Sequence, residues 1–181
     1  MIPAGYMYKR VSLPNGLTCA NVRDICSVSS CISENFCDYI THWKHNGFWF
    51  FNQPSIMETI AKTESTPLDG LTLCFYRIYP MQWVEDEKTW RAFGPDPAFE
   101  TDVVEPMHSK RLGFDVVTYS TQTAPECSPL SCNYLADRIA VNAHCLFDSF
   151  DTAKSALESG AFDNSEPGPF RILEVHTIQH A

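Results

Sequence analysis

The sequence predicts one α/β domain, with α+β as the alternative class, in which a mixed sheet is built from two copies of one unit. A Cys-Ser-x-x-Ser-Cys motif occurs twice, starting at Cys26 and at Cys127. A similar order of apolar patterns follows each copy, and a chain of 181 residues fits a single domain. We therefore expect repeats at residues 6–80 and 112–179 that are related by an approximate two-fold axis, with an acidic linker at 81–111. The alternative is two unrelated pieces whose likeness is accidental.

The first repeat is expected to run strand, Cys loop, helix, strand, helix, strand. Residues 6–13 predict the opening strand, and apolar residues at helical spacing predict a helix over 33–47, capped by its first residue, a serine. The aromatic run at 47–51 predicts a buried strand. Pro54 then predicts a helix start, because a proline in the first turn lacks only an amide hydrogen that has no partner there. Residues 71–79 predict the closing strand.

The second repeat is expected to follow the same order. Residues 113–119 predict a strand, 133–139 a short helix, and 144–147 a buried strand. Serine and aspartate followed by an apolar stripe predict a helix over 149–160, which ends at a glycine. Side chains that alternate regularly between two faces predict the last strand at 170–178. Together the two repeats predict about six strands and four helices.

The charge of the chain argues against several partners. The chain has 13 Lys and Arg against 22 Asp and Glu, a net charge of −9, of which the stretch from Glu85 to Glu105 contributes −5. This balance repels phosphate backbones, so we expect no nucleic-acid binding, whereas a basic protein partner fits the acidic linker. No apolar run is long enough for a membrane span, and no signal peptide is evident at the N-terminus, so we expect no membrane association and a cytoplasmic location.

The paired Cys loops are the first candidate for chemistry. If the loops meet near the axis, Cys26, Cys31, Cys127 and Cys132 can form a four-thiolate site, for which zinc is the candidate ion. A disulfide within each loop is a second interpretation. Thiols packed as small apolar groups are a third, and we favour this third one because a reducing cytosol keeps cysteines reduced.

A reactive thiol is a separate hypothesis. Cys31 and Cys132 precede predicted helices, and the positive end of a helix dipole lowers a thiol pKa. A thiol enzyme also needs a base. The hypothesis therefore uses Cys127 or Cys132 as nucleophile with His144 as base, and His176 is the other candidate base.

Three aromatic residues of the linker are candidates for partner binding. Trp83, Trp90 and Phe93 lie in an acidic, proline-containing segment outside the repeats, where they could form a docking surface. Packing of the linker against the sheet is the interpretation that we favour.

The sequence also lacks a phosphate-binding glycine loop, a nucleophile elbow and a dinucleotide fingerprint. We therefore expect first a non-enzymatic binding or regulatory protein. The alternatives are a thiol- or metal-dependent enzyme that uses the Cys loops, and a small-molecule binder with its pocket between the repeats.

Overall fold

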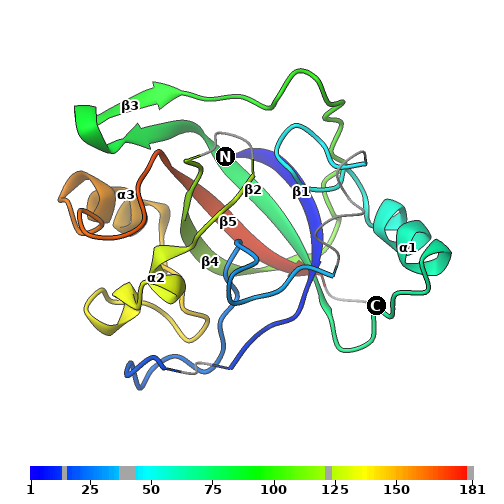
Figure 1. Ribbon diagram of the computed structural model, residues 1–181, viewed down its shortest axis with the longest axis horizontal. Coiled ribbons are helices and arrows are strands. Elements are labelled where there is room, and N and C mark those ends of the chain that lie inside the picture. The colour runs from blue at the N-terminus through cyan, green and yellow to red at the C-terminus, as the bar shows by residue number, and fades with distance from the viewer. Residues whose placement is uncertain (14–15, 37–43, 121–123, 179–181) are drawn as a thin grey trace.

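A single antiparallel sheet forms the centre of the computed structural model, which describes residues 1–13, 16–36, 44–120 and 124–178. The five strands of the described chain are β1 (Ile2–Lys9), β2 (Thr72–Val84), β3 (Thr89–Ala92), β4 (Ser109–Thr118) and β5 (Phe170–Ile178). Their order is β1-β2-β5-β4, and β3 pairs with the far end of β2 (Figure 1). All pairs among these strands are antiparallel, so the expectation of a mixed sheet is wrong. The described residues form five strands where about six were expected.

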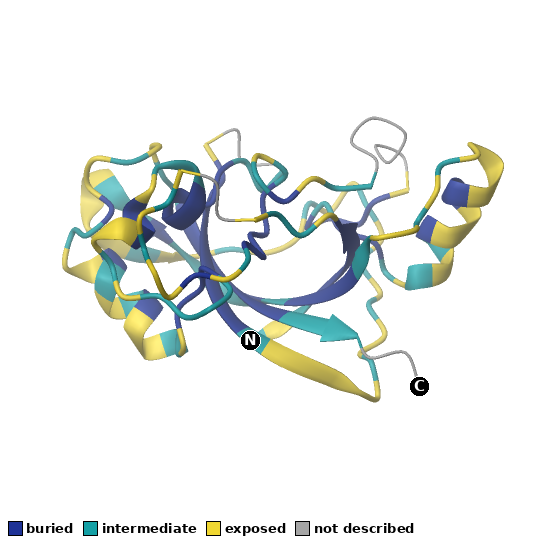
Figure 2. Cartoon of the chain, turned by 90° about the horizontal axis from the view of Figure 1, so that it is seen from below, coloured by how far each residue is buried: buried dark blue, intermediate teal, exposed yellow. Residues whose placement is uncertain are grey.

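The helices lie at two opposite ends of the sheet. Helix α1 (Pro54–Thr63) is at one end, and α2 (Pro129–Cys132) and α3 (Phe150–Glu158) are at the other, as both views show (Figures 1 and 2). Short 3-10 helices occupy Glu85–Glu87 and Leu135–Asp137. None of the helices in the described part of the chain has the length and apolar character needed to span a bilayer.

The predicted starts of two helices are confirmed. Pro54 is the first residue of α1. Ser149 caps α3, where its Oγ accepts from the amide of Thr152 at 3.2 Å within a capping box. The helix expected over 133–139 is reduced to the 3-10 helix Leu135–Asp137, and the α-helical turn lies before it, at Pro129–Cys132. Much of the other expected helix, residues 37–43, lies outside the described residues.

The buried strands expected at 47–51 and 144–147 are wrong, because both segments are turns. Each touches the sheet through one isolated bridge, Tyr6 to Phe51 and Phe114 to Phe147. Trp49 and Cys145 have positive φ angles of 65° and 60°, so the backbone reverses where a strand would continue. Phe48, Phe50 and Phe51 are nevertheless buried, as the apolar character of the run predicts.

An asparagine organises each of these turns. Asn46 Oδ1 accepts from the amides of Phe48 and Phe50 at 2.9 and 3.2 Å, and Nδ2 donates to Ala4 O at 2.8 Å. Asn142 makes the same three bonds in the second half of the chain. Its partners are the amides of His144 at 2.9 Å and Leu146 at 3.3 Å, and Leu112 O at 2.8 Å.

A glycine lets each turn lie against its strand. Gly5 and Gly113 lie at irregularities of β1 and β4 and have φ angles of +137° and +153°. A Cβ at Gly5 would lie 2.7 Å from Phe51 O, and one at Gly113 would lie 2.6 Å from Phe147 O. Any other residue would therefore push the turn off the sheet.

The segment at 81–111 is more regular than expected. Strand β2 continues to Val84 and forms a hairpin with β3, so the irregular linker is confined to the stretch between β3 and β4. This stretch lies against the first turn, since the amide of Asp96 donates to Gly47 O at 2.9 Å.

Candidate thiol site

The two Cys loops meet above a buried carboxyl group. Asp115 lies in β4 and is fully buried. Its Oδ2 accepts from the amide of Val28 in the first loop at 2.8 Å and from Ser128 Oγ in the second loop at 2.7 Å. The amide of Ser29 also donates to Ser128 Oγ at 3.3 Å. The fold thus joins two segments that lie about a hundred positions apart in the chain.

Three thiols converge where the loops touch. Cys31 is exposed, Cys132 is half-buried and Cys127 is buried. Hydrogen bonds from the thiols of Cys127 and Cys132 to the Cys31 sulfur lower the pKa of Cys31 well below that of an ordinary thiol. The hydrogen bond between Cys127 and Cys132 and, to a smaller extent, the one between Cys127 and Cys31 raise the pKa of Cys127. Cys31 Sγ also donates to Glu126 O at 3.1 Å, so the exposed thiol lies against the second Cys loop.

A buried lysine supports the first loop. Lys9, the last residue of β1, is 1% exposed, and its Nζ donates to the carbonyl oxygens of Val28 at 3.0 Å and Ser29 at 2.7 Å. Its positive charge is a further, smaller cause of the lowered pKa of Cys31. Neither Lys9 nor Asp115 was singled out in the sequence. Each is the one charged residue in an otherwise apolar stretch of strand, which is the signal that could have identified it.

Cys26, the fourth cysteine of the predicted site, makes its side-chain hydrogen bond outside the group of three thiols. Its Sγ lies 3.4 Å from Asp24 Oδ1. Burial, followed by the Asp24 carboxylate, raises the pKa of this thiol. The seven cysteines within the described residues are free, so neither loop contains a disulfide.

The helix-dipole argument for the reactive thiols is not supported at Cys132. Cys132 is the last residue of α2, at the end where the helix dipole is negative. His144, the predicted base, has its Nδ1 2.7 Å from Asp24 Oδ1 and belongs with Cys26. His176 lies in β5, and its Nδ1 is 3.1 Å from the Oγ of Ser109, the first residue of β4.

The three candidate docking aromatics pack against the body of the protein. Trp83 is only 5% exposed and faces Trp90 across the β2–β3 hairpin, with ring centroids 5.3 Å apart. Trp90 Nε1 donates to Glu158 in α3 at 2.8 Å. The ring of Phe93 lies 3.3 Å from the Arg171 guanidinium carbon. These contacts agree with packing against the sheet, and they leave Trp83 unavailable to a partner.

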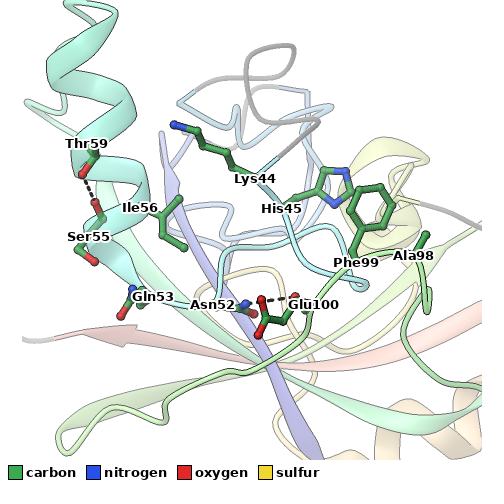
Figure 3. A pocket seen from close by; sticks show the side chains of 10 residues that line it. All are labelled: Lys44, His45, Asn52, Gln53, Ser55, Ile56, Thr59, Ala98, Phe99 and Glu100. Atoms are coloured by element: carbon green, nitrogen blue, oxygen red, sulfur yellow. Dashed lines mark hydrogen bonds between the residues drawn. The ribbon is translucent and has the colours of Figure 1, made fainter.

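Each half of the chain contains a pocket beside its long helix. The first, about 610 Å³, lies between α1, the start of the Asn46 turn and residues 98–100, and its side chains include Lys44, His45 and Glu100 (Figure 3). The second, about 680 Å³, lies beside α3 and is lined only by residues between 138 and 161. Neither pocket has walls from both predicted repeats.

Comparisons of the chain with protein families, curated proteins and solved structures found no match. Evidence for a function therefore comes from the site itself.

Proposed function

We propose that the protein carries out thiol–disulfide exchange through Cys31, with Cys132 as the resolving thiol. The observation that carries this proposal is the contact of one exposed thiol with two less exposed thiols from the other Cys loop. It supports the thiol-dependent alternative rather than the non-enzymatic binding protein expected first from the sequence.

The first step uses the Cys31 thiolate as nucleophile. Its sulfur attacks one sulfur of a substrate disulfide, the substrate S–S bond breaks, and a mixed disulfide with Cys31 forms. The departing substrate thiolate takes a proton from solvent. One substrate sulfur has then left as a thiol.

The second step releases the other half of the substrate. Cys132, the more accessible of the two remaining thiols, releases its proton to solvent, and its thiolate attacks the Cys31 sulfur. A Cys31–Cys132 disulfide forms, and the second substrate sulfur leaves and is protonated by solvent. The substrate disulfide has been reduced by two electrons, and the protein dithiol has been oxidised by two.

Two buried charges support this chemistry. Lys9 favours the thiolate form of Cys31. Asp115 joins the two loops by accepting hydrogen bonds from Val28 in the first and Ser128 in the second. A nucleophilic thiol needs a lowered pKa and access to solvent, and Cys31 has both.

The test is the reaction of the reduced protein with an aromatic disulfide that releases a coloured thiolate. We expect Cys31→Ser to slow the fast phase by about tenfold or more, and Cys19→Ser, at a half-buried cysteine outside the cluster, to leave it unchanged. Mass spectrometry should find probe trapped on Cys31 in Cys132→Ser, and a Cys31–Cys132 disulfide without probe in the unmodified sequence. Equal rates for Cys31→Ser and the unmodified protein would refute the proposal.

We also propose that the two halves arose by duplication and are related by an approximate two-fold axis. The palindromic order β1-β2-β5-β4, the paired asparagine turns and the paired strand glycines support this. Positions that line the first pocket recur 96 residues later in the second. The first set is Lys44, His45, Asn52, Ser55, Ile56 and Thr59, and the second is Ala140, Val141, Asp148, Asp151, Thr152 and Ser155.

The first pocket favours a second candidate function, the binding of a small polar molecule. Lys44, His45 and Glu100 give it groups of both charges, and the His45 ring stacks on Trp49 with centroids 4.1 Å apart. A volume of about 610 Å³ suits a metabolite-sized ligand. A thermal-shift screen of charged metabolites against the unmodified protein and Lys44→Ala tests this. A hit that stabilises both proteins equally, or no hit at all, would count against it.

A further inference from the structure

A second group of ligating side chains lies around His144. Its Nδ1 is 2.7 Å from Asp24 Oδ1, and the same oxygen is 3.4 Å from Cys26 Sγ. The three potential ligand atoms, an imidazole nitrogen, a carboxylate oxygen and a sulfur, all lie within 4.8 Å of one another. Ligand distances of about 2.0–2.3 Å separate neighbouring ligands of a tetrahedral zinc ion by roughly 3.3–3.8 Å. The group is therefore close to the size that such an ion requires.

The backbone holds these side chains together independently of any ion. The amide of Asp24 donates to Ala143 O at 3.2 Å, and that of Cys26 donates to His144 O at 3.2 Å. The amide of His144 in turn donates to Asn142 Oδ1 at 2.9 Å. Because both segments are already paired, binding an ion would require only small side-chain movements.

The group is open to solvent on one side. The side chains of Asp24 and His144 are 31% and 21% exposed, whereas Cys26 is buried. An ion here would have three protein ligands and one accessible position for water or a substrate atom. Three mixed ligands with an open fourth position are typical of catalytic rather than structural zinc sites.

We propose that Asp24, Cys26 and His144 bind a divalent cation of the zinc type, separately from the thiol cluster. The ligands would be one carboxylate oxygen, His144 Nδ1 and the Cys26 thiolate, whose proton is released to solvent on binding. The site joins the start of the first Cys motif to the turn that Asn142 organises.

The test is a titration of the metal-free, reduced full chain with Zn²⁺ in competition with a coloured chelator, and with Co²⁺ as a spectroscopic probe. We expect one ion per chain at this site, a thiolate-to-cobalt charge-transfer band, and loss of that band in Cys26→Ser. Asp24→Asn and His144→Gln should weaken binding by about tenfold or more. Cys31→Ser is the matched control and should bind as tightly as the unmodified protein.

Two results would overturn the proposal. One is the absence of stoichiometric Zn²⁺ binding by the unmodified protein. The other is loss of the cobalt band in Cys31→Ser but not in Cys26→Ser, which would assign the ion to the thiol cluster. Asp24→Asn alters a partly exposed side chain, so it remains informative if Cys26→Ser fails to fold, and circular dichroism checks each variant.

Discussion

The buried carboxyl group of Asp115 should make the stability of the protein depend on pH. Burial raises the pKa of this group from 3.8 to about 7, and the bonds from Val28 and Ser128 only partly oppose the rise. The folded chain therefore binds the Asp115 proton more tightly than the unfolded chain does. This stabilisation is complete below the unfolded pKa near 4 and is lost as the pH rises through 7.

The size of the effect follows from linkage. Between the two pKa values the folded chain holds one more proton, so the free energy of unfolding falls by about 1.4 kcal/mol per pH unit. The total contribution is about 4 kcal/mol. Asp115→Asn keeps an oxygen that can accept from Val28 and Ser128 but has no charge to bury. Its stability relative to the unmodified protein should therefore rise by about 4 kcal/mol between pH 4 and pH 8.

Urea unfolding followed by tryptophan fluorescence at pH 4, 6 and 8, at constant ionic strength, measures this difference. Asp148→Asn is the control, because it removes a negative charge at an exposed position. If the difference between Asp115→Asn and the unmodified protein stays constant across this range, burial does not raise the pKa of Asp115, and the reasoning from linkage is refuted.

Two further predictions concern the paired glycines and the buried lysine. Gly5→Ala and Gly113→Ala should each lower the free energy of unfolding by about 3 kcal/mol, because each new Cβ meets a backbone oxygen. Gly70→Ala, with open space around its Cβ, should cost about 1 kcal/mol; a large cost at only one of the paired positions would contradict the equivalence of the two turns. Lys9→Met should raise the pKa of Cys31, shifting the pH dependence of iodoacetamide alkylation upward, and an unshifted profile would remove Lys9 from the site.

The elements that the sequence predicts well are those with local causes. Strand β5 has the predicted bounds, because its alternation is a property of neighbouring residues. Pro54 and Ser149 mark helix starts through bonds within one turn. The runs at 47–51 and 144–147 were misassigned because apolar content indicates burial and not backbone direction. The direction is set by a positive φ and by an asparagine that reaches another segment.

The candidate sites could be predicted only in part, for a related reason. Recurrence of the Cys motif indicated that the loops belong together, and three of its four cysteines do converge. The place of Cys26 depends on Asp24 and on His144, which lies 120 positions away from Asp24 in the chain. No spacing rule connects such residues. A lone charge in an apolar strand, as at Asp115, is the kind of signal that sequence analysis can use, since a buried charge needs partners.

The asparagine turns also explain why only one half carries the proposed metal ligands. Another segment of the chain crosses each turn. In the first turn, the amide of Asp96 donates to the carbonyl oxygen of Gly47, the residue after Asn46. In the second turn, the amide of Asp24 donates to the carbonyl oxygen of Ala143, the residue after Asn142. The next residue is Phe48 in the first turn and His144 in the second. Phe48 packs against the ring of Phe93, so the first crossing adds to the core, whereas the second brings a carboxylate to an imidazole. The same backbone frame thus supports packing in one half and, in our proposal, metal ligands in the other. The side chains differ both after the asparagine and two residues after the crossing aspartate, where the first segment has Ala98 and the second has Cys26.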